Sequence, residues 1–140
     1  MKIYCSGIGG IGLSAYAALQ NAAGHDVLGS DHSLTPLTVD LEGQGVTIFS
    51  SQDGSHVPSD ADLFVYSEAI PEDAPERLKA TEFNITQMSY FEALGELSKN
   101  HTVIAVCGTH GKSSTTAMAT LALIDAGMDP TVVVGTKIPQ

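Results

Sequence analysis

The sequence lacks long apolar runs, and this shortage excludes a membrane-spanning protein. No run approaches the roughly 20 apolar residues that cross a bilayer, and the apolar stretch at the start of the chain is too short for a signal peptide. We therefore expect a cytoplasmic protein with no membrane partner. Cysteine is also scarce, since Cys5 and Cys107 are the only two, and each lies in an apolar run. This position favours reduced, buried thiols over a disulfide.

Basic side chains are few as well. The chain of 140 residues has 6 Lys and Arg against 16 Asp and Glu, a formal net charge of −10. Residues 1–100 hold 14 of the acidic and 4 of the basic side chains, whereas residues 101–140 hold two of each. An acidic surface repels polyanions, so we expect no nucleic-acid partner. An anionic small ligand would have to be held by backbone N–H groups at a helix N-terminus.

What the sequence does contain is a regular alternation of short apolar runs and helix-forming stretches. Strands are expected over residues 2–6, 26–30, 46–49, 63–67, 83–86, 102–107 and 132–134, and helices over residues 13–23, 36–43, 74–81, 89–99 and 113–126. Such alternation predicts parallel strands joined by helical crossovers. The predicted fold class is therefore α/β: a Rossmann-like parallel sheet with helices on both faces, followed by an incomplete P-loop βαβ unit.

The change in charge density near residue 100 marks the predicted domain boundary, with domains over residues 1–99 and 100–140. Only one strand–loop–helix–strand unit remains beyond that boundary. Two strands and one helix seldom bury enough apolar surface to fold alone. We therefore expect the chain to be a fragment of a longer protein. The alternative is that the tail packs on something else, for example by exchanging strands with a second copy in a homodimer.

The first candidate site is a glycine-rich loop with the sequence GIGGIG at residues 7–12. It matches the dinucleotide fingerprint G-x-G-x-x-G, and it lies between a predicted strand and a predicted helix. Asp31 follows about twenty residues later, where such folds hold a ribose hydroxyl. The loop could bind the diphosphate of NAD, of FAD or of a UDP-sugar, and the glycines could also serve only a tight turn.

The second candidate site is the sequence GTHGKS at residues 108–113. The strict phosphate-loop pattern needs a glycine at position 106, where this chain has Val106. Lys112 is nevertheless placed to reach the β- and γ-phosphates of a nucleotide, and Ser113 to bind Mg²⁺. A strand, loop, Lys-Ser pair and helix in that order is a stronger signal than the first loop. A loop histidine usually faces solvent, so we favour that interpretation of His110 over a direct chemical role.

Five segments together resemble the Mur ligases. They are IGGIGLSAYA, VLGSD, VYSEAIPEDAPE, AVCGTHGKSSTTAM and AGMDPTVVVG, in the order and spacing of that family. The resemblance implies three domains, of which the first binds a UDP-linked substrate and the second binds ATP. Within the family it is greatest to members that join L-alanine to UDP-N-acetylmuramate in peptidoglycan precursor synthesis. The members that recycle peptides onto the same sugar nucleotide remain an alternative, and so does a non-catalytic module that binds a UDP-sugar or a dinucleotide.

The resemblance also assigns residues to each ligand. The residues it places around the UDP part of the substrate are Gly9, Gly10, Ile11, Gly12, Ser30, Asp31, Ser67, Ala69 and Ile70. The residues it places around ATP are Gly108, Thr109, His110, Gly111, Lys112, Ser113, Ser114 and Thr115. It implies transfer of the γ-phosphoryl group to a carboxylate, followed by attack of the L-alanine amine. Lys112 is the implied catalytic residue and Ser113 the implied Mg²⁺ ligand.

Three departures from the family pattern concern particular contacts. Ser113-Ser114 replaces the usual threonines after the lysine, which keeps the hydroxyl group. Ala74-Pro75-Glu76 stands where the family commonly has Asn-Pro-Glu, and residues 50–53 replace a usual Gly-His. The acidic metal ligands of the second domain and the whole third domain are absent from these 140 residues. We therefore expect no ligation by this chain alone, whereas the parent protein would catalyse it.

Overall fold

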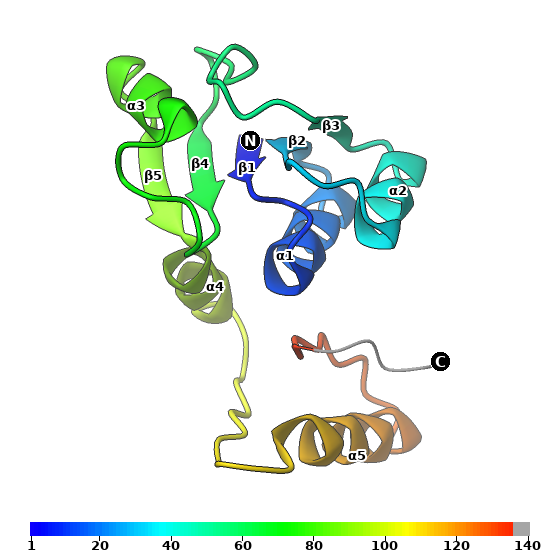
Figure 1. Ribbon diagram of the computed structural model, residues 1–140. Helices are drawn as coiled ribbons and strands as arrows, with labels where there is room; N and C mark the ends of the chain where they lie inside the picture. Colours follow the sequence, from blue (N-terminus) through cyan, green and yellow to red (C-terminus); the bar gives the residue numbers. More distant parts are fainter. Residues whose placement is uncertain (136–140) are drawn as a thin grey trace. The chain divides into compact units, whose positions relative to one another are not determined.

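The computed structural model describes residues 1–135. The chain divides into two compact units, Met1–Lys99 and Asn100–Gln140. In the first unit, five parallel strands form one sheet in the order β3-β2-β1-β4-β5 (Figure 1). The strands are β1 (Lys2–Ser6), β2 (Asp26–Ser30), β3 (Thr47–Phe49), β4 (Leu63–Tyr66) and β5 (Thr86–Ser89). Their carboxyl ends therefore lie along one edge of the sheet, where open α/β sheets bind ligands beside the strand at which the order reverses. That strand is β1.

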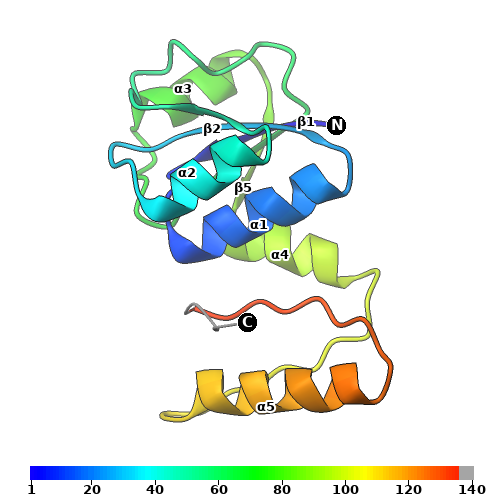
Figure 2. The same ribbon diagram turned by 90° about the vertical axis from the view of Figure 1, so that its right-hand side faces the viewer.

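Helices cover both faces of this sheet, which confirms the predicted fold class for the first unit. The helices are α1 (Ile11–Ala22), α2 (Pro36–Gly43), α3 (Pro75–Glu82) and α4 (Tyr90–Ser98). Figure 2 shows α3 on the opposite side of the sheet from α1 and α4. Alternate residues of β1 explain this layering, because Ile3 and Cys5 pack in the core with α1, α2 and α4, whereas Tyr4 packs in the core with α3. Strands buried on both faces are typical of parallel sheets.

Local capping signals set the starts of two helices. The Thr35 hydroxyl accepts the Thr38 N–H at the start of α2, and Ser89 and Glu92 form a reciprocal capping box at the start of α4. The Ser89–Glu92 box confirms the spacing argument from the sequence. Helix α1 is different: its N-cap is Gly10, which has no side chain to satisfy the first N–H groups. This uncapped start lies directly after β1.

Two predicted boundaries in the first unit are wrong by a few residues. Helix α1 begins at Ile11 rather than at residue 13. The fifth strand spans Thr86–Ser89 rather than residues 83–86, because α3 continues to Glu82 and Asn84 then takes a left-handed conformation with φ of 55°. A left-handed residue interrupts an extended strand. The strand can therefore start only after this turn.

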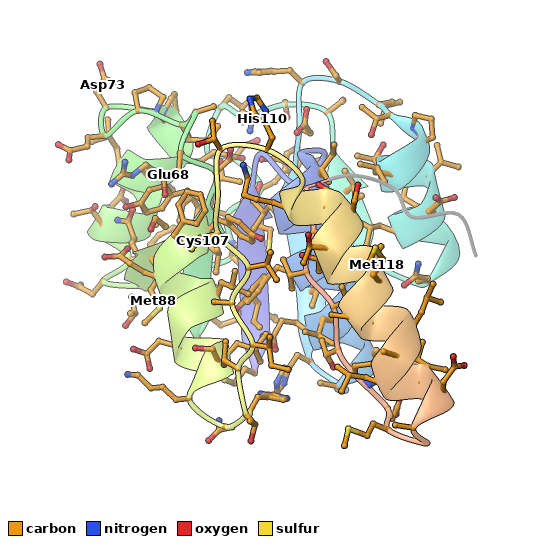
Figure 3. All side chains as sticks on the ribbon, turned by 90° about the horizontal axis from the view of Figure 1, so that it is seen from below. Glu68, Asp73, Met88, Cys107, His110 and Met118 are labelled. Atoms are coloured by element: carbon orange, nitrogen blue, oxygen red, sulfur yellow. The ribbon has the colours of Figure 1, made fainter. Side chains whose placement is uncertain are left out.

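The predicted strands of the second unit do not form among the residues described. Helix α5 (Lys112–Asp125) is present as expected, but residues 102–107 and 132–134 pair with no other strand within residues 1–135. A strand is stabilised by a hydrogen-bonded neighbour, so an unpaired extended segment is not a strand. The prediction that both thiols are buried is also wrong, since Cys5 is buried but Cys107 is exposed on the segment before α5 (Figure 3).

The two cysteines should therefore react differently with a thiol reagent. Burial raises the pKa of the Cys5 thiol to about 12, so Cys5 carries almost no thiolate at pH 8 and is also inaccessible. We expect one fast-reacting thiol per folded chain and a second only after denaturation. Two fast thiols, or none, would contradict this assignment.

The free energy of unfolding should also fall as the pH rises above about 9. The Cys5 thiol loses its proton there in the unfolded chain but keeps it in the folded chain.

Candidate functional site

The first glycine loop is anchored to the end of β2. Gly7 has φ of +80°, a conformation that favours glycine. The N–H groups of Gly7 and Ile8 both donate to the carbonyl oxygen of Ser30, at 2.8 and 3.0 Å, and the Gly10 N–H donates to the Gly7 carbonyl at 3.2 Å. The loop is thus a tight turn that reverses the chain from β1 into α1. It delivers the start of α1 to the carboxyl edge of the sheet.

The uncapped start of α1 can accept an anion. The first N–H groups of a helix have no intrahelical acceptor, and together with the helix dipole they attract negative charge. Here the N-cap is the exposed Gly10, so Ile11 and Gly12 offer such donors at the predicted position. Gly12 also permits close helix packing, because a Cβ atom there would lie 2.8 Å from the Tyr90 ring of α4. The arrangement is chemically suited to a diphosphate.

Asp31 holds the loop itself. Its Oδ2 accepts the Gly9 N–H at 2.8 Å and its Oδ1 accepts the Ser33 N–H at 2.9 Å. A Cβ atom on Gly9 would lie 2.8 Å from the same Oδ2, so glycine is needed for this contact. The Gly9 N–H is therefore already occupied in this structure, and any ribose hydroxyl would have to share the Asp31 carboxylate with two backbone donors.

The segment after β4 lies against the glycine loop. A Cβ atom on Gly7 would lie 2.9 Å from the Ser67 Cβ, and the Ser67 N–H donates to the Ser6 carbonyl at 3.0 Å. The Ile70 N–H donates to the Ser67 carbonyl at 2.9 Å, and the Ala69 N–H to the Ser67 hydroxyl at 3.4 Å. The structure thus brings the predicted residues 67–70 beside the loop of residues 7–12. Both stand at the edge of the sheet where β1 and β4 are neighbours.

Arg77 supports this segment and was not singled out by sequence. Its guanidinium group lies 3.8 Å from the centre of the Tyr66 ring, and its Nη1 donates to the Ile70 carbonyl at 3.4 Å. A cation over an aromatic ring and a hydrogen bond to the backbone both restrain the residues between them. Arg77 thereby fixes the turn that follows β4. No motif flagged it, because these contacts depend on the path of the chain after Tyr66.

A buried carboxylate lies beneath the same edge of the sheet. Glu76 is only 1% exposed. Its Oε1 accepts the Tyr4 hydroxyl at 2.7 Å, and its Oε2 accepts the hydroxyls of Ser6 at 2.5 Å and Ser30 at 2.8 Å. Burial and the Glu76 carboxylate both raise the pKa of Tyr4. The Ser30 side chain is therefore engaged in a buried cluster, and its place near a nucleoside, which the resemblance implies, stays a prediction.

The cluster includes residues from the two segments in which the first unit departs from the family pattern. Glu76 keeps the third position of the Asn-Pro-Glu pattern although Ala74 stands at the first. From residues 50–53, the Gln52 side chain donates to the Ser30 hydroxyl at 3.3 Å. The only sequence signal for Glu76 was this family position, because Ser6 lies 70 residues away and Ser30 lies 46 residues away in the chain.

The second glycine loop, in the second unit, wraps around its own lysine. The Lys112 ammonium group donates to the carbonyl oxygens of Gly108 at 2.7 Å and Thr109 at 3.5 Å. Gly111 is the N-cap of α5 in a left-handed conformation with φ of 77°, and no side chain caps the helix. The first N–H groups of α5 are therefore open donors beside a cation, as a phosphate group requires. His110 lies on the loop that leads into the helix (Figure 3).

The predicted Mg²⁺ ligand, Ser113, lies in the second unit. Ser113 is in the first turn of α5 and supplies one hydroxyl oxygen. Across residues 1–135, no group of three or more His, Cys, Asp or Glu side chains is placed to hold a metal ion. Mg²⁺ is usually bound by one or two carboxylates together with substrate phosphates. Ser113 could thus contribute to such a site but does not constitute one.

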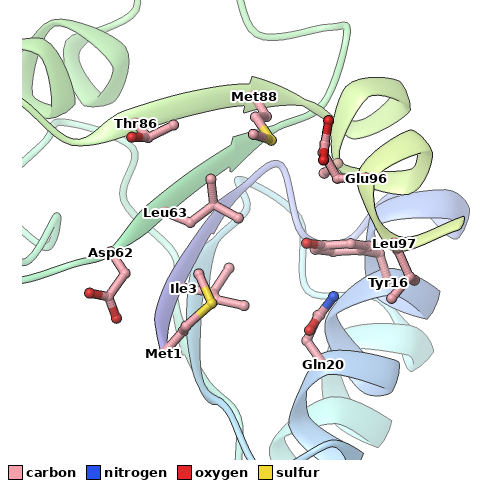
Figure 4. A pocket seen from close by; sticks show the side chains of 11 residues that line it. Met1, Ile3, Tyr16, Gln20, Asp62, Leu63, Thr86, Met88, Glu96 and Leu97 are labelled. Carbon is pink, nitrogen blue, oxygen red and sulfur yellow. The ribbon is translucent and has the colours of Figure 1, made fainter. Parts of the chain in front are cut away.

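A cavity of about 350 Å³ lies apart from the residues predicted around UDP. Figure 4 shows it between the sheet and helices α1 and α4, with Ile3, Tyr16 and Leu97 among the side chains that line it. Met1 and the starts of β4 and β5 also line it, at the opposite end of the strands from the glycine loop.

Among the helices of residues 1–135, none combines the length and the apolar character that crossing a bilayer requires.

Comparisons with known proteins identify relatives of this chain. The model of the Mur ligase family, catalytic domain, matches residues 2–102. UDP-N-acetylmuramate–L-alanine ligases from Clostridium novyi (strain NT) and Desulforapulum autotrophicum are 42% and 47% identical over 96% and 95% of this chain. The chain covers only 29% of the length of each of these curated relatives.

Solved structures show the same likeness. The UDP-N-acetylmuramate-alanine ligase from Thermotoga maritima has a TM-score of 0.89 and 34% identity, with 96% of this chain and 32% of that chain covered. A murein peptide ligase from Psychrobacter arcticus has a TM-score of 0.85 and 34% identity, with 91% of this chain and 27% of that chain covered. Because the family model matches more than half of the residues, this chain belongs to the Mur ligase family.

Proposed function

We propose that this chain is the N-terminal part of an ATP-dependent ligase that joins L-alanine to UDP-N-acetylmuramate. Residues 1–99 would bind the UDP part of the substrate, and residues 100–140 would begin the ATP-binding domain. The observation that carries this proposal is the 42% identity to a UDP-N-acetylmuramate–L-alanine ligase over 96% of the chain, which includes both glycine loops. The product would be a precursor of peptidoglycan, made in the cytoplasm.

The peptide-recycling ligase is the second candidate. Its support is the murein peptide ligase structure, which is as similar in sequence as the alanine-adding enzyme, at 34% identity. The alanine-adding function is favoured because the curated relatives reported above carry that name at 42% and 47% identity. The two candidates share the sugar nucleotide, so the proposed role of the first unit is the same in both.

The geometry supports a different ligand for each of the two loops. The start of α1 offers N–H donors to the UDP diphosphate, and the start of α5 offers donors and Lys112 to the ATP triphosphate. ATP would supply the phosphoryl group that activates the substrate carboxylate. Lys112, as the proposed catalytic residue, would neutralise charge on that group, and the Ser113 hydroxyl would face a Mg²⁺ ion. The chain alone would be inactive, because the regular structure described in its second unit is limited to one helix.

Calorimetric titration of the 140-residue chain tests the substrate assignment. We expect UDP to bind, UMP to bind more weakly because it lacks the β-phosphate, and NAD not to bind. ATP binding should be weak or undetectable. Binding of NAD without binding of UDP would sink the proposal. Equal affinity for UDP and UMP would show that the start of α1 does not hold the diphosphate.

Sedimentation of the chain would separately test whether two copies associate, as strand exchange through residues 100–140 would require.

A further inference from the structure

We propose that Glu76 is a positioning residue for the anion-binding loop, acting through the ends of β1 and β2. The proposal rests on the proposed function, since it concerns the same substrate site. Glu76 itself is buried and does not reach the site. Its effect would pass through Ser6 and Ser30, the last residues of the two strands that flank the loop.

The two oxygens of Glu76 contact different parts of the sheet. Oε1 accepts the hydroxyl of Tyr4, in the middle of β1. Oε2 accepts the hydroxyls of both strand-end serines, at 2.5 and 2.8 Å. Hydrogen bonds to a carboxylate are among the stronger ones in proteins. A single atom of Glu76 therefore ties the end of β1 to the end of β2.

The loop depends on the position of the β2 end. The Ser30 carbonyl accepts the N–H groups of Gly7 and Ile8, and Asp31, the next residue, accepts the N–H of Gly9. Three successive loop residues are thus held by the last residue of β2 and the residue that follows it. A shift of Ser30 would move all three, and with them the start of α1. Since oriented donors bind an anion without further ordering, loss of this support should weaken binding.

Burial gives Glu76 a cost that its contacts must offset. An unpaired buried carboxylate is strongly unfavourable, whereas three hydroxyl donors and the first turn of α3 both stabilise it. A hydrophobic residue in place of Glu76 would leave the three buried hydroxyl groups without this acceptor. The polar contacts of Glu76 also connect α3 to two strand ends, which an apolar side chain could not do with the same directionality.

The test compares variants that each remove the hydrogen-bond donors to one of the two carboxylate oxygens of Glu76. Ser6→Ala combined with Ser30→Ala removes the donors to Oε2, and Tyr4→Phe removes the donor to Oε1. We expect the double variant to weaken UDP binding about tenfold, and Tyr4→Phe to change it less than about twofold while lowering Tm. Glu76→Ala should weaken binding at least as much as the double variant if it folds. The serine variants keep the proposal testable if it does not.

Hydrogen exchange at the Gly7 and Ile8 amides provides a second measurement that needs no ligand. We expect faster exchange at these amides in the double serine variant than in Tyr4→Phe. Equal exchange in the two variants, or a UDP affinity that follows Tm in both, would overturn the positioning role. If the unaltered chain binds no UDP at all, the substrate assignment fails. The exchange rates then still decide whether Glu76 positions the loop.

Discussion

Replacing Gly29 with alanine should destabilise the first unit by about 3 kcal/mol. Gly29 is the next-to-last residue of β2, opposite Cys5 in the register of β1. A Cβ atom there would lie 2.5 Å from the Cys5 carbonyl oxygen and 2.7 Å from the Ile8 Cδ1 atom. The carbonyl belongs to the sheet, and Ile8 is fully buried, so neither can move aside. Urea denaturation followed by circular dichroism would measure the change.

Gly95→Ala is the matched control for this prediction. Gly95 lies inside α4, is exposed, and has nothing within 4 Å of the position of a Cβ atom. The same substitution there should stabilise the chain by roughly 0.5–1 kcal/mol, because alanine loses less backbone entropy than glycine in a helix. A Gly29→Ala variant as stable as the original chain would contradict the close approach of β1, β2 and the loop. Because Ile8 belongs to the glycine loop, Gly29→Ala should also weaken UDP binding.

Replacing Gly7 with alanine should impair the loop through two effects at once. The φ of +80° is strained for alanine, and the new Cβ atom would lie 2.9 Å from the Ser67 Cβ. We expect a loss of stability of about 2 kcal/mol and a UDP affinity at least about tenfold weaker. The affinity falls because the start of α1 and residues 67–70 must move apart. Denaturation and calorimetric titration of the same preparation measure the two quantities.

Gly24→Ala separates strain from contact in this experiment. Gly24 has a similar φ of +85°, but nothing lies within 4 Å of the position of its Cβ atom. It should therefore cost only the backbone strain, about 1 kcal/mol, and leave UDP affinity unchanged because it follows the far end of α1. If Gly7→Ala and Gly24→Ala changed stability and UDP affinity equally, the close approach of Gly7 to Ser67 would contribute to neither quantity.

Much of the fold follows from short-range patterns that can be recognised in the sequence. The capping box of Ser89 and Glu92 depends on residues three apart, and the turn at Gly7 depends on the freedom of one glycine. The alternation of strands and helices then suffices to predict a parallel sheet. Both candidate anion-binding loops were identified for the same reason, since each is a contiguous stretch between a predicted strand and a predicted helix.

Errors arose where distant residues decide the outcome. Residues 102–107 are apolar enough to suggest a strand, but a strand also requires a partner, and none pairs with them within the described residues. Cys107 was expected to be buried on the same ground and is exposed. The Asp31 carboxylate was expected to bind a ribose hydroxyl, which stays a prediction, but its contact with the Gly9 N–H was not foreseen. The approach of Asp31 to Gly9 in space could not be derived from their separation in the chain.

The sequence by itself determined the α/β class, the two candidate phosphate-binding loops and the family resemblance, because all three are expressed in contiguous segments and their order. Only the tertiary structure decided which groups support the first loop. Glu76, in the first turn of α3, meets Ser6 and Ser30 at the ends of β1 and β2. That meeting depends on the strand order β3-β2-β1-β4-β5, and no local spacing encodes an order that arises from the packing of the whole sheet.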